Sequence, residues 1–204
     1  MRIAAPVFTL IPVFLCWMAL STTGALAQSA ETGFGALARH LPDSGQDDGW
    51  RVVNTGDSFE IENIGNPQAI RYYFVGPAQG REGRRRIEAA VSIHPDSTGS
   101  AGLLYGLNEA RDVYHMVTLD AQGMLRVFRR DADGFRPMIE QSSDAYVADG
   151  MNLLALQENG DEVSFSLNGR EMGSIGGDLF GRGGTGLGLV GDVRAFYTYF
   201  SDAG

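Results

Sequence analysis

The stretch Arg86-Ile87-Glu88-Ala89-Ala90-Val91-Ser92-Ile93-His94 decides the fold class, because apolar side chains occupy every second position in it. These apolar side chains would share one face of a strand, and the opposite face carries Glu88, Ser92 and His94. A period of two residues is typical of a β-strand that is buried on one side only. We therefore expect a half-buried strand here.

Runs of the same kind lie on both sides of this stretch. Residues 58–64 and 69–75 are rich in strand-forming side chains, and later runs are separated by turns such as Asp120-Ala121-Gln122-Gly123 and Asp131-Ala132-Asp133-Gly134. Glycine adopts positive φ angles at little cost, so such tetrapeptides favour tight turns between antiparallel strands. Roughly ten regularly spaced strands with almost no helical period predict an all-β sandwich or barrel.

The first 27 residues have the three parts of a secretory signal peptide. Arg2 precedes the apolar stretch 3–20, and the small-residue exit Ala25-Leu26-Ala27 precedes Gln28. We expect cleavage after Ala27, and a periplasmic or secreted protein. An uncleaved membrane anchor and a lipoprotein modified at Cys16 are the alternatives. The polar residues 21–24 disfavour the anchor, and the bulky side chains before Cys16 disfavour the lipoprotein.

The predicted mature chain consists of a short arm and one domain. Residues 28–48 hold a single apolar patch, 34–41, among small and polar side chains, which predicts a flexible arm whose patch could form two helical turns. Residues 49–204 are long enough to bury a core without covalent links. Cleavage would remove the only cysteine, so we expect a disulfide-free monomer with no membrane span.

The charge of the chain excludes several classes of function. Its 16 basic residues are all arginine, against 25 acidic ones, and the formal net charge is −9. Exclusive use of arginine suggests a GC-rich bacterial genome. Lysine-dependent chemistry is excluded, because Schiff-base and phosphate-loop sites both need the amino group of a lysine side chain. An acidic chain repels polyanions, so we expect no nucleic-acid partner. The one basic run, Arg84-Arg85-Arg86, is predicted to be solvated.

Four pieces of the sequence follow one another in an order that resembles a known family. They are residues 101–107 with 114–117, residues 123–129, residues 152–155 with 163–169, and residues 186–189 with 194–197. This order resembles the laminin-G-like group of the concanavalin A-like lectin and glucanase superfamily, over about 48–201. The resemblance implies a two-sheet antiparallel jelly-roll sandwich whose concave sheet often binds glycans or proteins. The chain lacks the Glu-x-Asp-x-Glu strand that family-sixteen glycoside hydrolases use.

Other motifs do not support a cofactor. Two overlapping Gly-x-Gly-x-x-Gly matches, which begin at Gly181 and Gly186, lack the helix and acidic residue of a dinucleotide site, so we assign them to turns and close packing. The three histidines have no metal-ligand spacing. Members of the family sometimes bind calcium, and the loop with Asn108, Glu109 and Asp112 is the alternative site. An ordinary acidic loop is the favoured interpretation.

The candidate binding patch consists of Glu88, His94, Tyr114 and Arg126. Each is predicted on the polar face of its strand, and the four form one surface if their strands are neighbours in the concave sheet. Aromatic rings beside polar side chains on an exposed sheet are typical of glycan sites. Tyr105 and Trp50 are predicted to be core or anchoring residues instead.

Three functions remain open at this stage. The favoured hypothesis is an exported, non-catalytic sandwich that binds a carbohydrate or an envelope partner through its concave sheet. The second is a glycoside hydrolase with a divergent active site, for which Glu88 and His94 are the candidate acid and base. The third is a structural module that docks to an envelope protein.

Overall fold

The computed structural model describes residues 34–75, 85–108, 113–176 and 183–203. The predicted signal peptide, residues 1–27, lies outside this part of the chain. So do Arg84, Gly181 and residues 109–112 of the candidate calcium loop. Among the described residues, no helix has the length and apolar character needed to cross a membrane.

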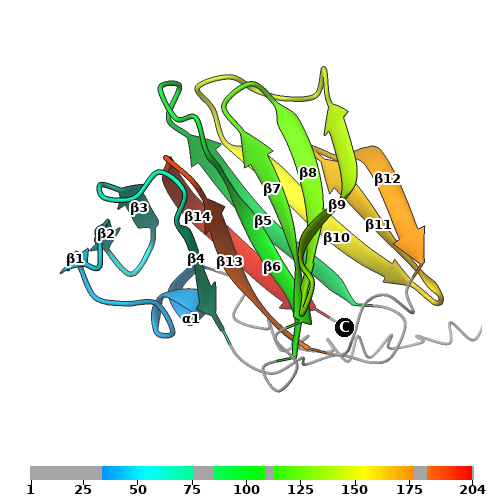
Figure 1. The fold of residues 1–204 in the computed structure, drawn as a ribbon, viewed down its shortest axis with the longest axis horizontal. Helices are drawn as coiled ribbons and strands as arrows, with labels where there is room; N and C mark the ends of the chain where they lie inside the picture. The colour runs from blue at the N-terminus through cyan, green and yellow to red at the C-terminus, as the bar shows by residue number, and fades with distance from the viewer. Residues whose placement is uncertain (1–33, 76–84, 109–112, 177–182, 204) are drawn as a thin grey trace, which may run out of the picture. The chain divides into compact units, whose positions relative to one another are not determined.

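The described chain forms two antiparallel sheets that pack face to face, which confirms the predicted jelly-roll sandwich (Figure 1). The larger sheet has eight strands in the order β1-β2-β3-β14-β5-β10-β11-β12, and the smaller has six in the order β4-β13-β6-β7-β8-β9. The strands of the larger sheet are β1 (Gly45–Asp47), β2 (Trp50–Asn54), β3 (Phe59–Asn63), β14 (Arg194–Ala203), β5 (Arg86–Ile93), β10 (Asn152–Asn159), β11 (Glu162–Leu167) and β12 (Arg170–Gly176). Those of the smaller sheet are β4 (Ile70–Phe74), β13 (Gly184–Val190), β6 (Ser100–Asn108), β7 (Val113–Asp120), β8 (Met124–Asp131) and β9 (Gly134–Ser142).

Alternating side chains of both sheets fill the core between them. On β5, Ile87, Ala89 and Val91 are fully buried, as the two-residue period predicts. Tyr105 and Trp50 are also buried in this core, which confirms their assignment from the sequence. The two layers therefore leave each sheet with one outer face, which is where a ligand could bind.

The stretch predicted as a flexible arm is described from Phe34 onward, and there it packs onto the sandwich. A short helix, α1 (Phe34–Ala38), begins it, and β1 pairs with β2. Phe34, Leu37 and Leu41 belong to the main hydrophobic core. Phe34 and Leu37 are three residues apart on one side of α1, and Leu41 follows the helix, so the apolar patch is buried against the sandwich.

Glycines on β13 allow close packing, as the sequence predicted. A methyl group added at Gly186 would lie 1.8 Å from the carbonyl oxygen of Tyr73 on β4. One added at Gly188 would lie 2.3 Å from Cε of Met116, whose side chain lies over this glycine. The glycines of this strand thus allow close packing within the sheet and beneath Met116.

A buried ion pair connects the ends of the two sheets. Arg85, which precedes β5, donates from Nε to Oδ1 of Asp202 on β14 at 2.7 Å and from Nη1 to the carbonyl of Gly183 at 3.1 Å. Thr185 on β13 donates to the other oxygen of Asp202 at 2.8 Å. Because Arg85 is buried, the prediction of a solvated basic run is wrong for this residue. Its charge is compensated by a partner that is distant in sequence.

Removing the acidic partner of Arg85 tests the importance of this connection. We expect Asp202→Asn to lower the free energy of unfolding by about 3 kcal/mol, because it leaves a buried guanidinium without its counter-charge. Urea unfolding at pH 7 measures the change, with Asp161→Asn as an exposed control on the β10–β11 turn. Equal stability of the two variants would contradict the proposed role of the pair.

His115 lies in the core, as the alternation of β7 predicts. It is fully buried on the inward face of this strand, with Arg129 of β8 as its cross-strand neighbour. Burial, and to a smaller extent the charge of Arg129, lowers the pKa of His115 from 6.5 to about 4. The folded protein therefore keeps this imidazole neutral at pH values where the unfolded chain binds a proton.

The depressed pKa of His115 makes stability depend on pH. Between pH 6.5 and about 4, His115 takes up a proton in the unfolded state but not in the folded state. The contribution of His115 to the free energy of unfolding is therefore complete above this pH range and is lost as the pH falls through it. We expect a loss of up to about 3 kcal/mol from this residue. Urea unfolding of the wild type and of His115→Leu at several pH values measures it. An unchanged pH slope in the variant would rule out this assignment.

Candidate functional site

The four residues of the predicted patch lie on two different sheets. Tyr114 and Arg126 are on the outer face of the six-stranded sheet, on β7 and β8. Glu88 is on the outer face of β5 in the eight-stranded sheet, and His94 directly follows that strand. The condition that all four strands are neighbours is not met. Tyr114 and Arg126 therefore share one face on neighbouring strands, four residues apart in register, and Glu88 and His94 face the opposite side of the sandwich.

The outer face of the six-stranded sheet carries an apolar cluster separate from the main core. Leu104, Tyr114 and Met116 are buried there, and Phe74 and Val190 pack against them. These side chains alternate with core residues along their strands, so they cannot belong to the space between the sheets. Because these side chains are buried, only the exposed residues beside them can contact a ligand.

Three rings form an aromatic band across this face: Tyr72 on β4, Tyr114 on β7 and Phe135 on β9. The ring centroids of Tyr72 and Tyr114 are 5.3 Å apart, and those of Tyr114 and Phe135 are 6.1 Å apart. Tyr72 is 42% exposed and Phe135 is 38% exposed. The guanidinium of Arg130 on β8 lies 5.1 Å from the centroid of Phe135. The band thus offers two exposed rings joined by a buried one.

The band also indicates which face is concave. β4 and β9 are the two edges of the six-stranded sheet, and five strand spacings would separate them by about 24 Å if it were flat. Rings from both edges nevertheless pack against the same central side chain, Tyr114. Both edge side chains therefore lean inward over the sheet, as expected for a concave outer face.

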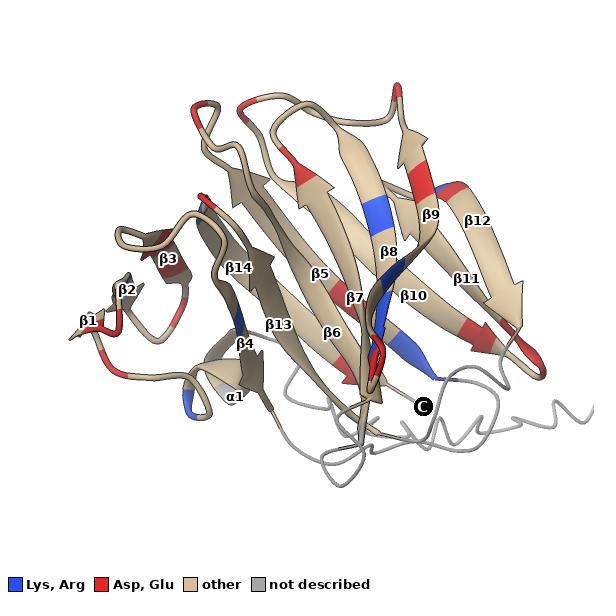
Figure 2. Cartoon of the chain, in the orientation of Figure 1, with Lys and Arg blue, Asp and Glu red and all other residues tan. Residues whose placement is uncertain are grey.

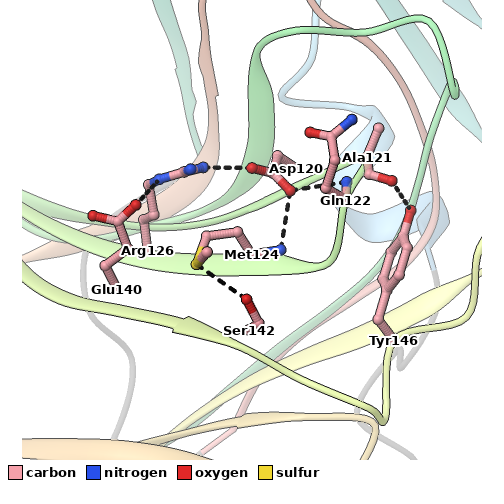
Figure 3. Close-up of polar contacts among 8 residues, drawn as sticks. All are labelled: Asp120, Ala121, Gln122, Met124, Arg126, Glu140, Ser142 and Tyr146. Atoms are coloured by element: carbon pink, nitrogen blue, oxygen red, sulfur yellow. Dashed lines mark hydrogen bonds and ion pairs between the residues drawn. The ribbon is translucent and has the colours of Figure 1, made fainter.

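Arg126 forms the polar part of the same face (Figure 3). Its guanidinium donates from Nη1 to Asp120 at 2.7 Å and from Nε to Glu140 of β9 at 3.2 Å. Burial lowers the pKa of Arg126. Hydrogen bonds and charges from both carboxylates outweigh this effect, so the pKa of Arg126 is raised above its ordinary value. The side chain is thus a permanent cation held in one orientation.

Asp120 also fixes the turn between β7 and β8. Its Oδ1 accepts the backbone N–H groups of Gln122 at 2.9 Å and Met124 at 3.0 Å, while Oδ2 accepts from Arg126 (Figure 3). The carboxylate is therefore held by three donors. This rigidity means that the polar group needs little ordering when a ligand binds.

Glu88 and His94 are not arranged as an acid and base pair. Six residues separate them along one extended strand face, which corresponds to about 20 Å. Glu88 accepts hydrogen bonds from the Arg86 side chain at 2.6 Å and from the hydroxyl of Tyr199 at 3.4 Å. Carboxyl pairs that cleave glycosidic bonds lie within about 10 Å of each other. The separation therefore does not support the hydrolase hypothesis for this pair.

A metal site has no support within the described ranges. No group of three or more His, Cys, Asp or Glu side chains there could hold an ion. Of the candidate calcium loop, only Asn108, the last residue of β6, falls inside the described chain.

Tyr72, Phe135 and Arg130 were not among the residues predicted from the sequence. In β4, Tyr72 alternates with Tyr73, which packs against the core, so the two rings face opposite sides of the sheet. A run that is apolar on both faces does not reveal which ring points outward. Arg130 alternates with inward residues along β8, but this alternation does not identify the ring of Phe135 beside it.

Comparison with known proteins gives a fold and no closer relationship. No protein-family model matches the sequence, and no curated protein matches it significantly. Among solved structures, a carbohydrate-binding module of family 66 from Bacillus subtilis is 16% identical with a TM-score of 0.52, and covers 79% of this chain and 99% of its own. The Emp46p carbohydrate recognition domain, in its potassium-bound form, is 11% identical with a TM-score of 0.54, and covers 76% and 88%.

An enzyme is also similar in structure. The β-glucanase of Bacillus licheniformis is 8% identical with a TM-score of 0.50, and covers 80% of this chain and 90% of its own. Binding domains and a hydrolase thus share this architecture, so the site and not the fold must distinguish the two functions. The chain has the fold of the concanavalin A-like lectins and glucanases.

Proposed function

We propose that this protein is an exported, non-catalytic carbohydrate-binding β-sandwich whose ligand lies on the outer face of the six-stranded sheet. The observation that carries the proposal is the presence of the aromatic band and the Arg126 group on one face. The order of elements in the amino-terminal 27 residues, typical of a signal peptide, supports export. The fold shared with a carbohydrate-binding module agrees with the proposal.

The chemistry of the face suits a sugar chain. The C–H faces of a pyranose ring are apolar and stack on aromatic side chains, which the exposed rings of Tyr72 and Phe135 supply. Sugar hydroxyls donate to carboxylates and accept from guanidinium groups, which Asp120, Glu140 and Arg126 supply. Arg126 and Arg130 are four residues apart on β8, or about 13 Å. The face therefore fits an oligosaccharide better than a single sugar.

The described part of this face does not support hydrolysis. The outward positions of β7 at its centre are Tyr114, Met116 and Thr118, and none of them carries a carboxylate. Asp120 and Glu140 are both ion-paired with the same arginine, whereas a glycosidase needs one carboxyl group in its acid form. A binding role therefore agrees better with the geometry than catalysis does.

Truncation of the exposed rings tests the proposal. A glycan array of the purified protein first identifies a ligand, and isothermal titration then gives its affinity. We expect Tyr72→Ala and Phe135→Ala each to weaken binding about tenfold, because each removes a stacking surface. Val147→Ala is a control, since Val147 is an exposed apolar residue in the β9–β10 connection, outside the six-stranded sheet. Unchanged affinity in both ring variants would place the glycan elsewhere.

The polar group is tested with Arg126→Gln and Tyr114→Phe. Arg126→Gln removes a charged donor and should weaken binding about tenfold. The turn should persist in this variant, because Asp120 still accepts two backbone N–H groups. Tyr114→Phe keeps the central ring and should bind nearly normally. Release of reducing ends from the bound glycan would instead favour the hydrolase, and no binding to any glycan would favour a module that docks to an envelope protein.

A further inference from the structure

We propose a second ligand-binding site on the outer face of the eight-stranded sheet, opposite the aromatic band, that accepts a single neutral sugar ring. A shallow pocket of about 230 Å³ lies there, lined by Glu60, Ser92, His94, Arg194, Ala195 and Phe196. The existence of the pocket is independent of the proposed function. The choice of a sugar as its ligand rests on that function.

Strand register places the lining residues in one row. Phe196 on β14 is the direct cross-strand partner of Glu60 on β3 and of Ser92 on β5. All three are on outward positions, and the Phe196 side chain is 38% exposed. An exposed ring is thus flanked on one side by a carboxylate and on the other by a hydroxyl. This is the combination of stacking surface and hydrogen-bonding groups that a sugar ring requires.

Ion pairs hold the charged groups of the pocket in position. Nε of Arg194 donates to Oε1 of Glu60 at 2.6 Å. Arg194 also faces Glu62 across the strands, and Glu62 is ion-paired with Arg51 on β2. The pKa of Arg194 is raised, first by its hydrogen bond to Glu60 and then by the two glutamate charges. The side chains at the pocket are therefore oriented before a ligand arrives.

The charge balance favours a neutral ligand. Arg51 and Arg194 compensate Glu60 and Glu62 across three adjacent strands, so this set of four carries no net charge. A charged ligand would have to displace an existing ion pair. Hydroxyl groups can instead donate to the free lone pairs of the Glu60 carboxylate and accept from the remaining Arg194 N–H groups without breaking the pair.

The test follows backbone amide signals of the isotope-labelled protein by NMR during titration with methyl glycosides of glucose, galactose, mannose and N-acetylglucosamine. With at least one glycoside we expect saturable shifts of amides on β5 and β14 around Ser92 and Phe196. Phe196→Ala should weaken this binding about tenfold, because the stacking ring is lost. Glu60→Gln should weaken it by a similar factor and keeps the shape of the side chain.

Control variants separate this site from the other face. Ile64→Ala alters an exposed apolar residue just beyond β3 and should leave the titration unchanged. Phe135→Ala should also leave the pocket shifts unchanged, since Phe135 lies on the opposite sheet. Pocket shifts that survive both Phe196→Ala and Glu60→Gln, or no pocket shifts with any glycoside, would overturn the second site. Neither result affects the proposed function, which depends on the glycan array and the Tyr72 and Phe135 variants.

Discussion

Packing of the two sheets against each other is the constraint on which the rest of the molecule depends. Facing sheets lie about 10 Å apart, so each strand gives alternate side chains to the shared core and leaves the others on an outer surface. On β7 this division buries Val117 and Leu119 between the sheets and turns Tyr114 and Met116 outward. The core therefore decides which residues are available for binding. The two outer faces differ because their residues are not required to match each other.

The sequence predicted the features that depend on alternation of side chains along one strand. It did not predict the features that depend on pairing of strands that are distant in the sequence. The alternation on β5 and the core position of Tyr105 were predicted from local pattern, and both are confirmed. The separation of Glu88 from Tyr114 was not foreseen, because β5 and the β6–β7 hairpin that follows it in the sequence belong to opposite sheets. Pairing of β5 with β14 and β10 brings together residues about 60 to 117 positions apart in the sequence, which no local pattern encodes.

Buried polar residues were harder to predict than apolar ones. Arg85 belongs to a basic run that is typical of a solvated surface, yet it is buried and paired with Asp202. A charged side chain is buried only where a partner compensates it, and here the partner is 117 residues away. The aromatic band is a similar case. Tyr72 and Tyr114 come from strands that are separated by β13 and β6 in the sheet, so their contact follows from the complete topology.

The charges of the strands distinguish the two outer surfaces further (Figure 2). On outward strand positions, the six-stranded sheet carries Arg126 and Arg130 against Asp120 and Glu140, whereas the eight-stranded sheet carries three arginines, Arg51, Arg86 and Arg194, against five carboxylates, Glu60, Glu62, Glu88, Glu162 and Glu171. The excess negative charge of these outward positions thus lies on the eight-stranded sheet. A polyanionic glycan would therefore be repelled by the eight-stranded sheet, and added salt would weaken this repulsion. A neutral glycan would show little salt dependence on either side, so salt dependence separates these two ligand classes.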